Sequence, residues 1–159
     1  MTDDDARAQA AAMYAADAAT RRLGIVVGDV AVGRSTARMT VTADMVNGHG
    51  VCHGGYLFLL ADSAFAFACN TRGAAAVAAG ADVEFLAPAR EGDQLVAEAR
   101  ERVVRGRSGV YDVTVRRGDE VLVEFRGRSR TLRPAGAPDR LGALASAQEI
   151  ATSPTTPTA

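Results

Sequence analysis

The sequence contains no lysine and no tryptophan, and it has only two cysteines and two histidines among its 159 residues. Without lysine, catalysis through a Schiff base or a lysine nucleophile is excluded. All 18 basic residues are therefore arginines, so a phosphate or carboxylate of a ligand has to be bound by arginine or by backbone N–H groups. Two cysteines do not make a disulfide framework, and a chain of this length does not need one. We therefore expect a reduced, cytoplasmic environment.

A surplus of charge and a long apolar run are also missing. The net charge is −1, which leaves no basic surface for nucleic acid and no polyanionic tail. The longest apolar segment, residues 56–69, is interrupted by Asp62 and is too short for a membrane span. Acidic residues at positions 3–5 stand where a signal peptide would have basic ones, so no secretory signal is expected. Neither nucleic acid nor a membrane is expected as a partner.

Length and composition indicate one folded domain between two terminal segments. With 48% hydrophobic content, the chain can form a single domain with an adequate core. Residues 1–22 are alanine-rich from about position 4, with an acidic start and a basic end, and predict an N-terminal helix. After Arg133 the composition shifts to Ala, Pro, Ser and Thr, which predicts a flexible C-terminal tail over 134–159. The domain proper is expected over 23–133.

Hydrophobic periodicity predicts one buried helix among strands. Residues 25–32 and 36–43 alternate in polarity around Gly33 and Arg34, which predicts a hairpin with a tight turn at that pair. Residues 54–70 are apolar on almost every side, so this helix has to be wrapped by a sheet or by a partner. Strand patterns joined by short links, which favour antiparallel pairing, follow over 76–86, 93–104, 110–116 and 120–132. The predicted fold class is α+β, with an antiparallel sheet around one long helix.

The segment from Asn47 to Gly55 is the most informative part of the chain. It holds both histidines, one cysteine and a Gly-Gly pair, and it leads directly into the apolar helix. Glycine lets the backbone approach a ligand closely, and the free N–H groups at a helix start favour an oxygen that becomes negative. Asp62 is the one acid in that helix, and a charge in apolar surroundings usually has a role or a partner. An oxyanion site with a carboxylate suggests acyl transfer to water.

The pattern Asn-x₅-His-Gly-Gly, followed by Leu-Ala-Asp inside the helix, resembles the hot-dog-fold acyl-CoA thioesterases. The resemblance is strongest to their phenylacetate-degradation (PaaI-type) branch and covers about residues 23–132. The positions that carry it are 47–49, 52–55, 57–58, 60–62, 66–70, 83–88, 92–93 and 109–113. It implies the hot-dog fold, with an antiparallel sheet wrapped around one long central helix. It also implies hydrolysis of an acyl-CoA, with phenylacetyl or hydroxyphenylacetyl as the leading acyl group.

The resemblance implies roles for individual residues. Gly54 would supply the oxyanion N–H, and Asp62 would be the catalytic carboxylate, as a general base toward water or as a nucleophile. Asn47 and His53 would position water, the carbonyl group or the loop. Related thioesterases have a serine that assists the water, and here Ala78 stands at the corresponding position, so that helper is absent.

The coenzyme A part of the substrate would be bound mainly by two segments that follow the apolar helix. The second glycine of the Gly-Gly pair would contribute as well. The residues that the resemblance assigns to this binding are Gly55, Phe85, Arg90, Gly106, Arg107 and Ser108. Arginines on strands, such as Arg126 and Arg128, are by default solvated side chains. No metal and no redox cofactor is implied, because coenzyme A belongs to the substrate and the product.

Other functions fit parts of the same pattern. A non-catalytic acyl-CoA-binding or sensing module with this fold would keep the arginine contacts and would not need Asp62. A hot-dog hydratase would pair an acid with His49 or His53. Cys52 beside His53 could form a nucleophilic dyad, although such dyads are usually built from distant segments. His49, Cys52 and His53 could also bind zinc, but their spacing matches no common zinc pattern.

The distance along the helix predicts a dimer. Gly54 and Asp62 are eight residues apart, which is ~12 Å at 1.5 Å per residue. An oxyanion donor has to lie ~3 Å from the carbonyl oxygen while the base reaches the same carbon, so one chain cannot supply both. A two-fold axis with antiparallel helices would bring Gly54 of one chain to Asp62 of the other. We expect a homodimer with shared active sites, and the resemblance implies that two such dimers assemble as a dimer of dimers.

Overall fold

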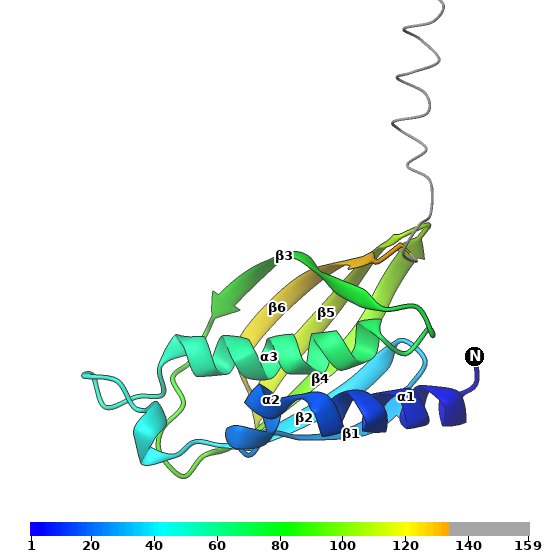
Figure 1. Ribbon diagram of the computed structural model, residues 1–159. Coiled ribbons are helices and arrows are strands. Elements are labelled where there is room, and N and C mark those ends of the chain that lie inside the picture. The colour runs from blue at the N-terminus through cyan, green and yellow to red at the C-terminus, as the bar shows by residue number, and fades with distance from the viewer. Residues whose placement is uncertain (134–159) are drawn as a thin grey trace, which may run out of the picture.

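The computed structural model describes residues 1–133, and the tail predicted over 134–159 lies outside the described residues. One long helix lies across one face of a six-stranded antiparallel sheet, as the sequence predicts (Figure 1). The strand order is β1-β2-β4-β5-β6-β3. The elements are α1 (Asp3–Ala16), α2 (Ala18–Arg22), β1 (Val26–Ala31), β2 (Arg34–Thr40), η1 (Ala43–Met45), α3 (Gly54–Cys69), β3 (Ala76–Phe85), β4 (Gln94–Arg105), β5 (Ser108–Arg117) and β6 (Glu120–Thr131).

Helix α3 forms the core with the concave face of the sheet. Its Phe65 is almost fully buried and packs against Tyr111 of β5 and Phe125 of β6. Gly127 makes this packing possible, because a Cβ there would lie 2.7 Å from the Phe65 ring. On another side of the helix, Phe67 packs in a separate cluster with residues of α1 and β1. The expectation that the helix is wrapped is confirmed, and its nearly uniform hydrophobicity follows from having neighbours on two sides.

The N-terminal segment differs from the single helix expected up to residue 22. Asp17 ends α1 and caps α2, and its carboxylate accepts hydrogen bonds from the N–H (3.0 Å) and the Oγ1 (2.6 Å) of Thr20. Aspartate offers the backbone a capping bond that competes with continued helix, whereas the alanines on both sides favour helix. The hydroxyl of Thr20 also lies 3.3 Å from the Oγ of Ser63, which joins α2 to α3.

The first hairpin turns one residue earlier than expected. Arg34 already belongs to β2 and pairs with Arg100 of β4, so the turn falls at Val32 and Gly33 instead of Gly33 and Arg34. Gly33 has φ +75°, a conformation that glycine adopts without strain. The short helix η1 was not predicted within the loop. Among residues 1–133, no helix is both long and apolar enough to cross a membrane.

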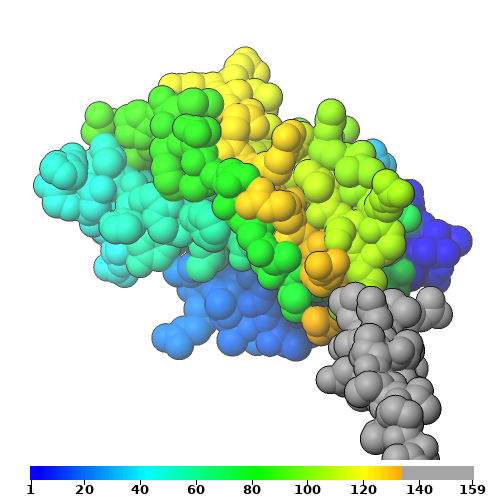
Figure 2. Space-filling model, turned by 90° about the horizontal axis from the view of Figure 1, so that it is seen from above, coloured from blue at the N-terminus to red at the C-terminus, as the bar shows by residue number. Residues whose placement is uncertain are grey.

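Strand β3 forms one edge of the sheet and is exposed along its length (Figure 2). None of its ten residues is buried, and Val77 and Phe85 are among the exposed large hydrophobic side chains. Natural proteins usually protect a long edge strand, because its unpaired backbone groups can bind another strand. This edge is therefore available for pairing with a strand of a second chain.

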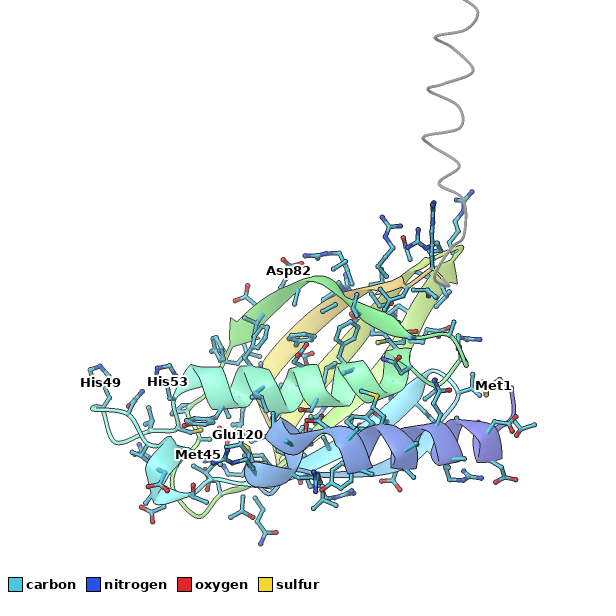
Figure 3. All side chains as sticks on the ribbon, in the orientation of Figure 1. Met1, Met45, His49, His53, Asp82 and Glu120 are labelled. Carbon is cyan, nitrogen blue, oxygen red and sulfur yellow. The ribbon has the colours of Figure 1, made fainter. Side chains whose placement is uncertain are left out.

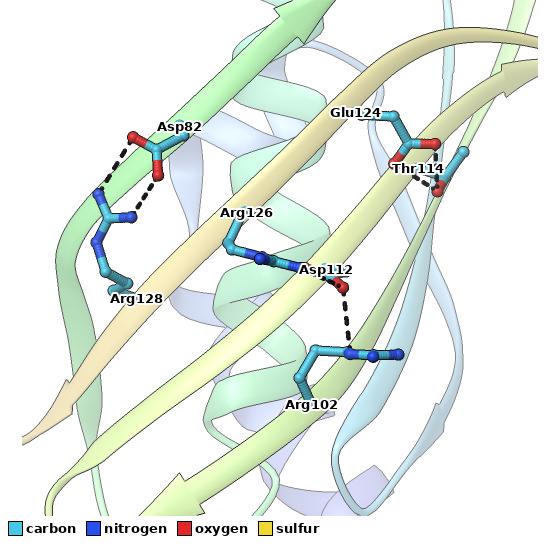
Figure 4. Close-up of polar contacts among 7 residues, drawn as sticks. All are labelled: Asp82, Arg102, Asp112, Thr114, Glu124, Arg126 and Arg128. Atoms are coloured by element: carbon cyan, nitrogen blue, oxygen red, sulfur yellow. Dashed lines mark hydrogen bonds and ion pairs between the residues drawn. The ribbon is translucent and has the colours of Figure 1, made fainter.

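The outer face of the sheet carries paired charges (Figure 4). Arg126 donates to Asp112 at 2.6 Å, Arg102 approaches the same carboxylate at 3.3 Å, and Arg128 pairs with Asp82. The hydrogen bond from Arg126 lowers the pKa of Asp112. Exposed pairs of this kind contribute little to stability. The default interpretation of these arginines as solvated strand residues is therefore adequate, with the addition that they pair with acids on neighbouring strands.

Candidate active site

The start of α3 leaves one backbone donor available. His53 caps the helix: its Nδ1 accepts the N–H of Gly55 at 3.0 Å, and its carbonyl oxygen accepts the N–H of Tyr56 at 2.9 Å. The N–H of Gly54 has no hydrogen-bond partner among residues 1–133. A free N–H at the positive end of a helix is suited to bind an oxygen that becomes negative. Gly54 is therefore the available donor of the Gly-Gly pair, while Gly55 is engaged in the cap.

Phe85 at the end of β3 lies against Gly54. Its ring atoms are 3.2 and 3.3 Å from the position that a Cβ of residue 54 would occupy. A side chain at this position would press on the ring. Glycine is therefore favoured at position 54 for a steric reason, independently of the free N–H. The ring itself is 51% exposed, so the structure places an accessible aromatic side chain directly beside the predicted oxyanion donor.

The loop before α3 is fixed by its own hydrogen bonds. The side-chain oxygen of Asn47 accepts the N–H groups of His49 (2.9 Å) and Val51 (3.4 Å), and Gly50 has φ +73°. The amide NH₂ of Asn47 makes no hydrogen bond among the described residues. His49 lies at the outer end of the loop and His53 lies near the helix (Figure 3). The oxygen of Asn47 thus orders the loop, and only its NH₂ group is left to bind water or substrate.

Two backbone bonds tie the end of this loop to the body of the protein. The N–H of Cys52 donates to the carbonyl of Ala89, and the N–H of His53 donates to the carbonyl of Met45, both at 2.8 Å. The helix start is thereby held next to the segment that contains Phe85 and Arg90. Met45 belongs to the same loop, but Ala89 is distant in sequence, so the position of Gly54 depends on the folded sheet and not on the loop alone.

Asp62 is the one charged residue of α3 and lies half-buried in its middle. Among residues 1–133 its carboxylate forms no hydrogen bond and no ion pair, so the purely structural interpretations, a cap for a neighbouring backbone group or a partner for arginine, find no support in this structure. Burial raises the pKa of Asp62. A carboxylate that lacks stabilising partners and is partly desolvated is a stronger base than one in water.

The two cysteines are free thiols whose surroundings disfavour the thiolate. Burial and then the charge of Asp62 raise the pKa of Cys69 to about 12. Burial and Asp93 raise the pKa of Cys52, and its Sγ donates to the backbone carbonyl of His53 at 3.7 Å. The Nδ1 of His53 is occupied by the helix cap. The hypothesis of a Cys52–His53 dyad therefore has no geometric support.

The residues expected to bind coenzyme A fall into two groups within one chain. Gly55, Phe85 and Arg90 lie at the N-terminal end of α3, whereas Gly106 and Arg107 form the turn between β4 and β5 and Ser108 begins β5. The twelve residues of β4 separate Arg90 from this turn, which corresponds to about 35–40 Å of extended strand. One chain therefore does not bring the two groups together, and neither does it bring Gly54 to Asp62.

A residue of β6 that was not among the expected binding residues contacts the turn between β4 and β5. Arg130 of β6 donates to the Oγ of Ser108 at 2.9 Å, and Arg107 donates from Nε to the carbonyl of Thr131 at 2.9 Å. These bonds hold Arg107 and Arg130 on one exposed corner, and Arg105 at the end of β4 adds a third arginine next to it. Arg130 stands two residues after Arg128 on β6, but only the pairing of β6 with β5 reveals its contact with Ser108.

An open hollow of about 340 Å³ lies beside the helix start and is lined by His53, Gly55, Tyr56 and Leu59. Asp62 does not line it. Within residues 1–133, no group of three or more His, Cys, Asp or Glu side chains is placed to hold a metal ion, so His49, Cys52 and His53 do not assemble into a site there.

Comparisons with known proteins bear on this geometry. The profile of the thioesterase superfamily matches residues 49–124. The chain is 46% identical over 122 residues to the acyl-coenzyme A thioesterase PaaI of Escherichia coli K12, covering 76% of this chain and 87% of that protein. The structure of the E. coli PaaI protein from the phenylacetic acid degradation operon superposes with a TM-score of 0.81 at 43% identity, over 82% of this chain and 96% of that one. The TT0310 protein of Thermus thermophilus superposes with a TM-score of 0.71 at 37% identity, over 73% and 98%.

Proposed function

The chain belongs to the thioesterase superfamily and has its hot-dog fold, and from this premise we propose that it is an acyl-CoA thioesterase. The reaction consumes an acyl-CoA and water and releases a carboxylic acid and coenzyme A. The observation that carries the proposal is that α3 bears a free N–H at Gly54 and an unpaired, half-buried carboxylate at Asp62. A binding module would need neither feature.

The chemistry assigns one role to each group. The N–H of Gly54 donates to the thioester carbonyl and stabilises the negative charge that develops on its oxygen. Asp62 either removes a proton from the attacking water or attacks the carbonyl carbon itself, which would give a mixed anhydride that water then hydrolyses. In both routes the thiolate of coenzyme A leaves. A single turnover in ¹⁸O-labelled water tests the nucleophilic route: if water attacks the aspartyl carbonyl of the anhydride, the released acid carries an unlabelled aspartate oxygen and the label enters Asp62, whereas the general-base route puts the label into the acid.

Each active site is proposed to be shared between two chains. Gly54 and Asp62 of one chain are ~12 Å apart along α3, and the exposed β3 edge offers a place for a second chain to pair. If two β3 strands pair antiparallel about a two-fold axis, the two α3 helices also run antiparallel. Gly54 of one chain can then face Asp62 of the other, which gives two equivalent sites per dimer. Two such dimers would form the tetramer.

The same pairing would bring together the two separate groups of residues that are expected to bind coenzyme A. The register places Val77 of β3 opposite Arg130, and Arg130 opposite Ser108, so the basic corner lies at the start of β3. Phe85, which contacts Gly54, lies at the end of β3. Antiparallel pairing of two β3 strands would bring the start of one next to the end of the other. Arg107, Ser108 and Arg130 of one chain could then bind the coenzyme A whose thioester lies at Gly54 of its partner.

The acyl group is proposed to be aromatic, such as phenylacetyl or hydroxyphenylacetyl. Two accessible rings, Phe58 and Phe85, lie within about one helical turn of Gly54, and a flat acyl group can pack against them. A panel of acyl-CoA esters with a free-thiol readout tests the activity and the preference together. We expect a higher kcat/KM for phenylacetyl-CoA than for palmitoyl-CoA. A higher kcat/KM for palmitoyl-CoA would contradict the aromatic assignment. If no ester in the panel is hydrolysed, the proposed thioesterase activity is contradicted.

The reaction is proposed to need no metal, and the protein to act in the cytoplasm, where the free thiols of Cys52 and Cys69 stay reduced. Dialysis against a strong chelator is expected to leave the rate unchanged, because a thiolate is a good leaving group and a carboxylate suffices as base. A rate that is lost with chelator and restored by zinc would bring back a metal mechanism.

A further inference from the structure

Phe58 lies midway between the two groups proposed to act on the thioester. It is four residues from Gly54 and four from Asp62, which is ~6 Å along the helix in each direction. Residues four apart project from the same side of a helix, so the three side-chain positions follow one stripe of α3. The side chain of Phe58 is 36% exposed. The other large hydrophobic side chains of α3 are buried or half-buried.

The ring of Phe58 is held in place by a contact with the sheet. It packs edge-on against Phe125 of β6, with ring centroids 5.3 Å apart and an interplanar angle of 71°. Phe125 contacts Phe65, and Phe65 contacts Tyr111, so four rings connect the surface of the helix to the core. Edge-to-face pairs of this kind favour one relative orientation. Phe58 is thus an exposed aromatic side chain with a fixed direction.

Symmetry determines what faces this ring. The place of Phe58 in the dimer rests on the proposed function, in which Gly54 of one chain faces Asp62 of the other. In a two-fold dimer, the axis has to pass α3 at the residue equidistant from the two, which is residue 58. Phe58 of one chain then faces Phe58 of its partner, and both active sites lie about one helical turn from this pair of rings.

We propose that Phe58 is a specificity-determining residue, whose ring meets its symmetry mate on the two-fold axis and forms the wall between the two acyl pockets. The wall closes each pocket on the side of the axis and presents the face or edge of a ring to the acyl group. Because Phe125 holds the ring, it does not move aside for a long alkyl chain. Flat, short acyl groups fit, and longer chains meet the wall.

Crosslinking tests the position of the axis without any assay of activity. Phe58→Cys is expected to join two chains rapidly with a short bismaleimide. Ala66→Cys is the matched control, because residue 66 lies about two turns farther along the same stripe and is half-buried, whereas Phe58 is exposed. The symmetry mate of residue 66 would be ~24 Å away along the helices, so little crosslinking is expected. The wild type controls for Cys52 and Cys69, which are buried. Equal crosslinking of both variants, or of neither, would overturn the inference.

Substrate preference tests the role. Phe58→Ala is expected to raise the ratio of kcat/KM for decanoyl-CoA to that for phenylacetyl-CoA by at least ~10-fold, since it opens the pocket toward the axis. Phe67→Leu, on the side of α3 that packs against α1, should leave the ratio within a few-fold. If Phe58→Ala does not fold, Phe58→Leu replaces it, with a smaller shift in the same direction. An unchanged ratio in a folded, active variant would overturn the inference, whereas a wild type without any thioesterase activity would overturn the proposed function instead.

Discussion

Replacing Asp62 with asparagine is expected to lower kcat about 10²–10⁴-fold while the fold stays intact, as the loss of a general base or nucleophile should. Asparagine has nearly the same shape, and the carboxylate makes no hydrogen bond or ion pair among residues 1–133 that would be lost. Steady-state kinetics with the best acyl-CoA ester measures the effect, and circular dichroism checks the fold. Turnover within a few-fold of the wild type would remove Asp62 from the mechanism.

The pH dependence of kcat and of Tm in the wild type and in Asp62→Asn gives an independent test of the role of Asp62. Burial raises the pKa of Asp62, and the mechanism needs the ionised form, so kcat should fall as the pH drops through that raised pKa. The acidic limb should be absent from the residual activity of Asp62→Asn. Folding disfavours the charged form, so the stability penalty is present above the folded-state pKa and disappears as the pH falls through it. The variant should therefore have a Tm equal to or above that of the wild type at neutral pH, and the difference should close in acid.

Gly54→Pro is expected to lower kcat by about 10²–10³-fold, because proline has no N–H to donate to the carbonyl oxygen. Residue 54 is the first residue of α3, where proline is well tolerated. His53 before it is already extended, with φ −62° and ψ 132°, as a residue preceding proline requires. The substitution therefore removes a donor with little change to the helix.

Gly54→Ala is the matched control, since it adds a Cβ and keeps the N–H. The added carbon would lie 3.2 Å from the Phe85 ring, which is exposed and can shift. We expect the alanine variant to stay within about 10-fold of wild-type kcat, and Phe85→Ala to relieve the crowding in the double variant. Equal losses in the alanine and proline variants would show that the space at residue 54 matters and its N–H does not.

The sequence predicted the order of elements well because each has a clear local signal. The strands alternate in polarity along one buried face, and α3 is a long apolar run that opens at two glycines. The break at Asp17 was missed because a capping bond to Thr20 outweighs the helix preference of the surrounding alanines. The hairpin turn was placed one residue late, because the start of β2 is set by its pairing with β4.

The candidate site was predictable as a set of residues and not as an arrangement. The Gly-Gly pair and the lone Asp62 are the sequence features from which we propose the chemistry, and both lie in one helix. The contact of Phe85 with Gly54, the occupied oxygen of Asn47 and the bond from Arg130 to Ser108 all depend on how the loop and distant strands fold and pair. No local pattern reports such contacts.

Subunit mixing tests the central claim, that each active site takes Gly54 from one chain and Asp62 from the other. Gly54→Pro and Asp62→Asn, each inactive alone, are mixed in equal amounts and exchanged under mild denaturant, with exchange verified by native mass spectrometry. In a mixed dimer, one site carries both lesions and the other carries neither. Roughly half of the dimers are mixed, each with one intact site of two, so roughly a quarter of wild-type activity should return. Verified exchange with no return of activity would contradict the shared site.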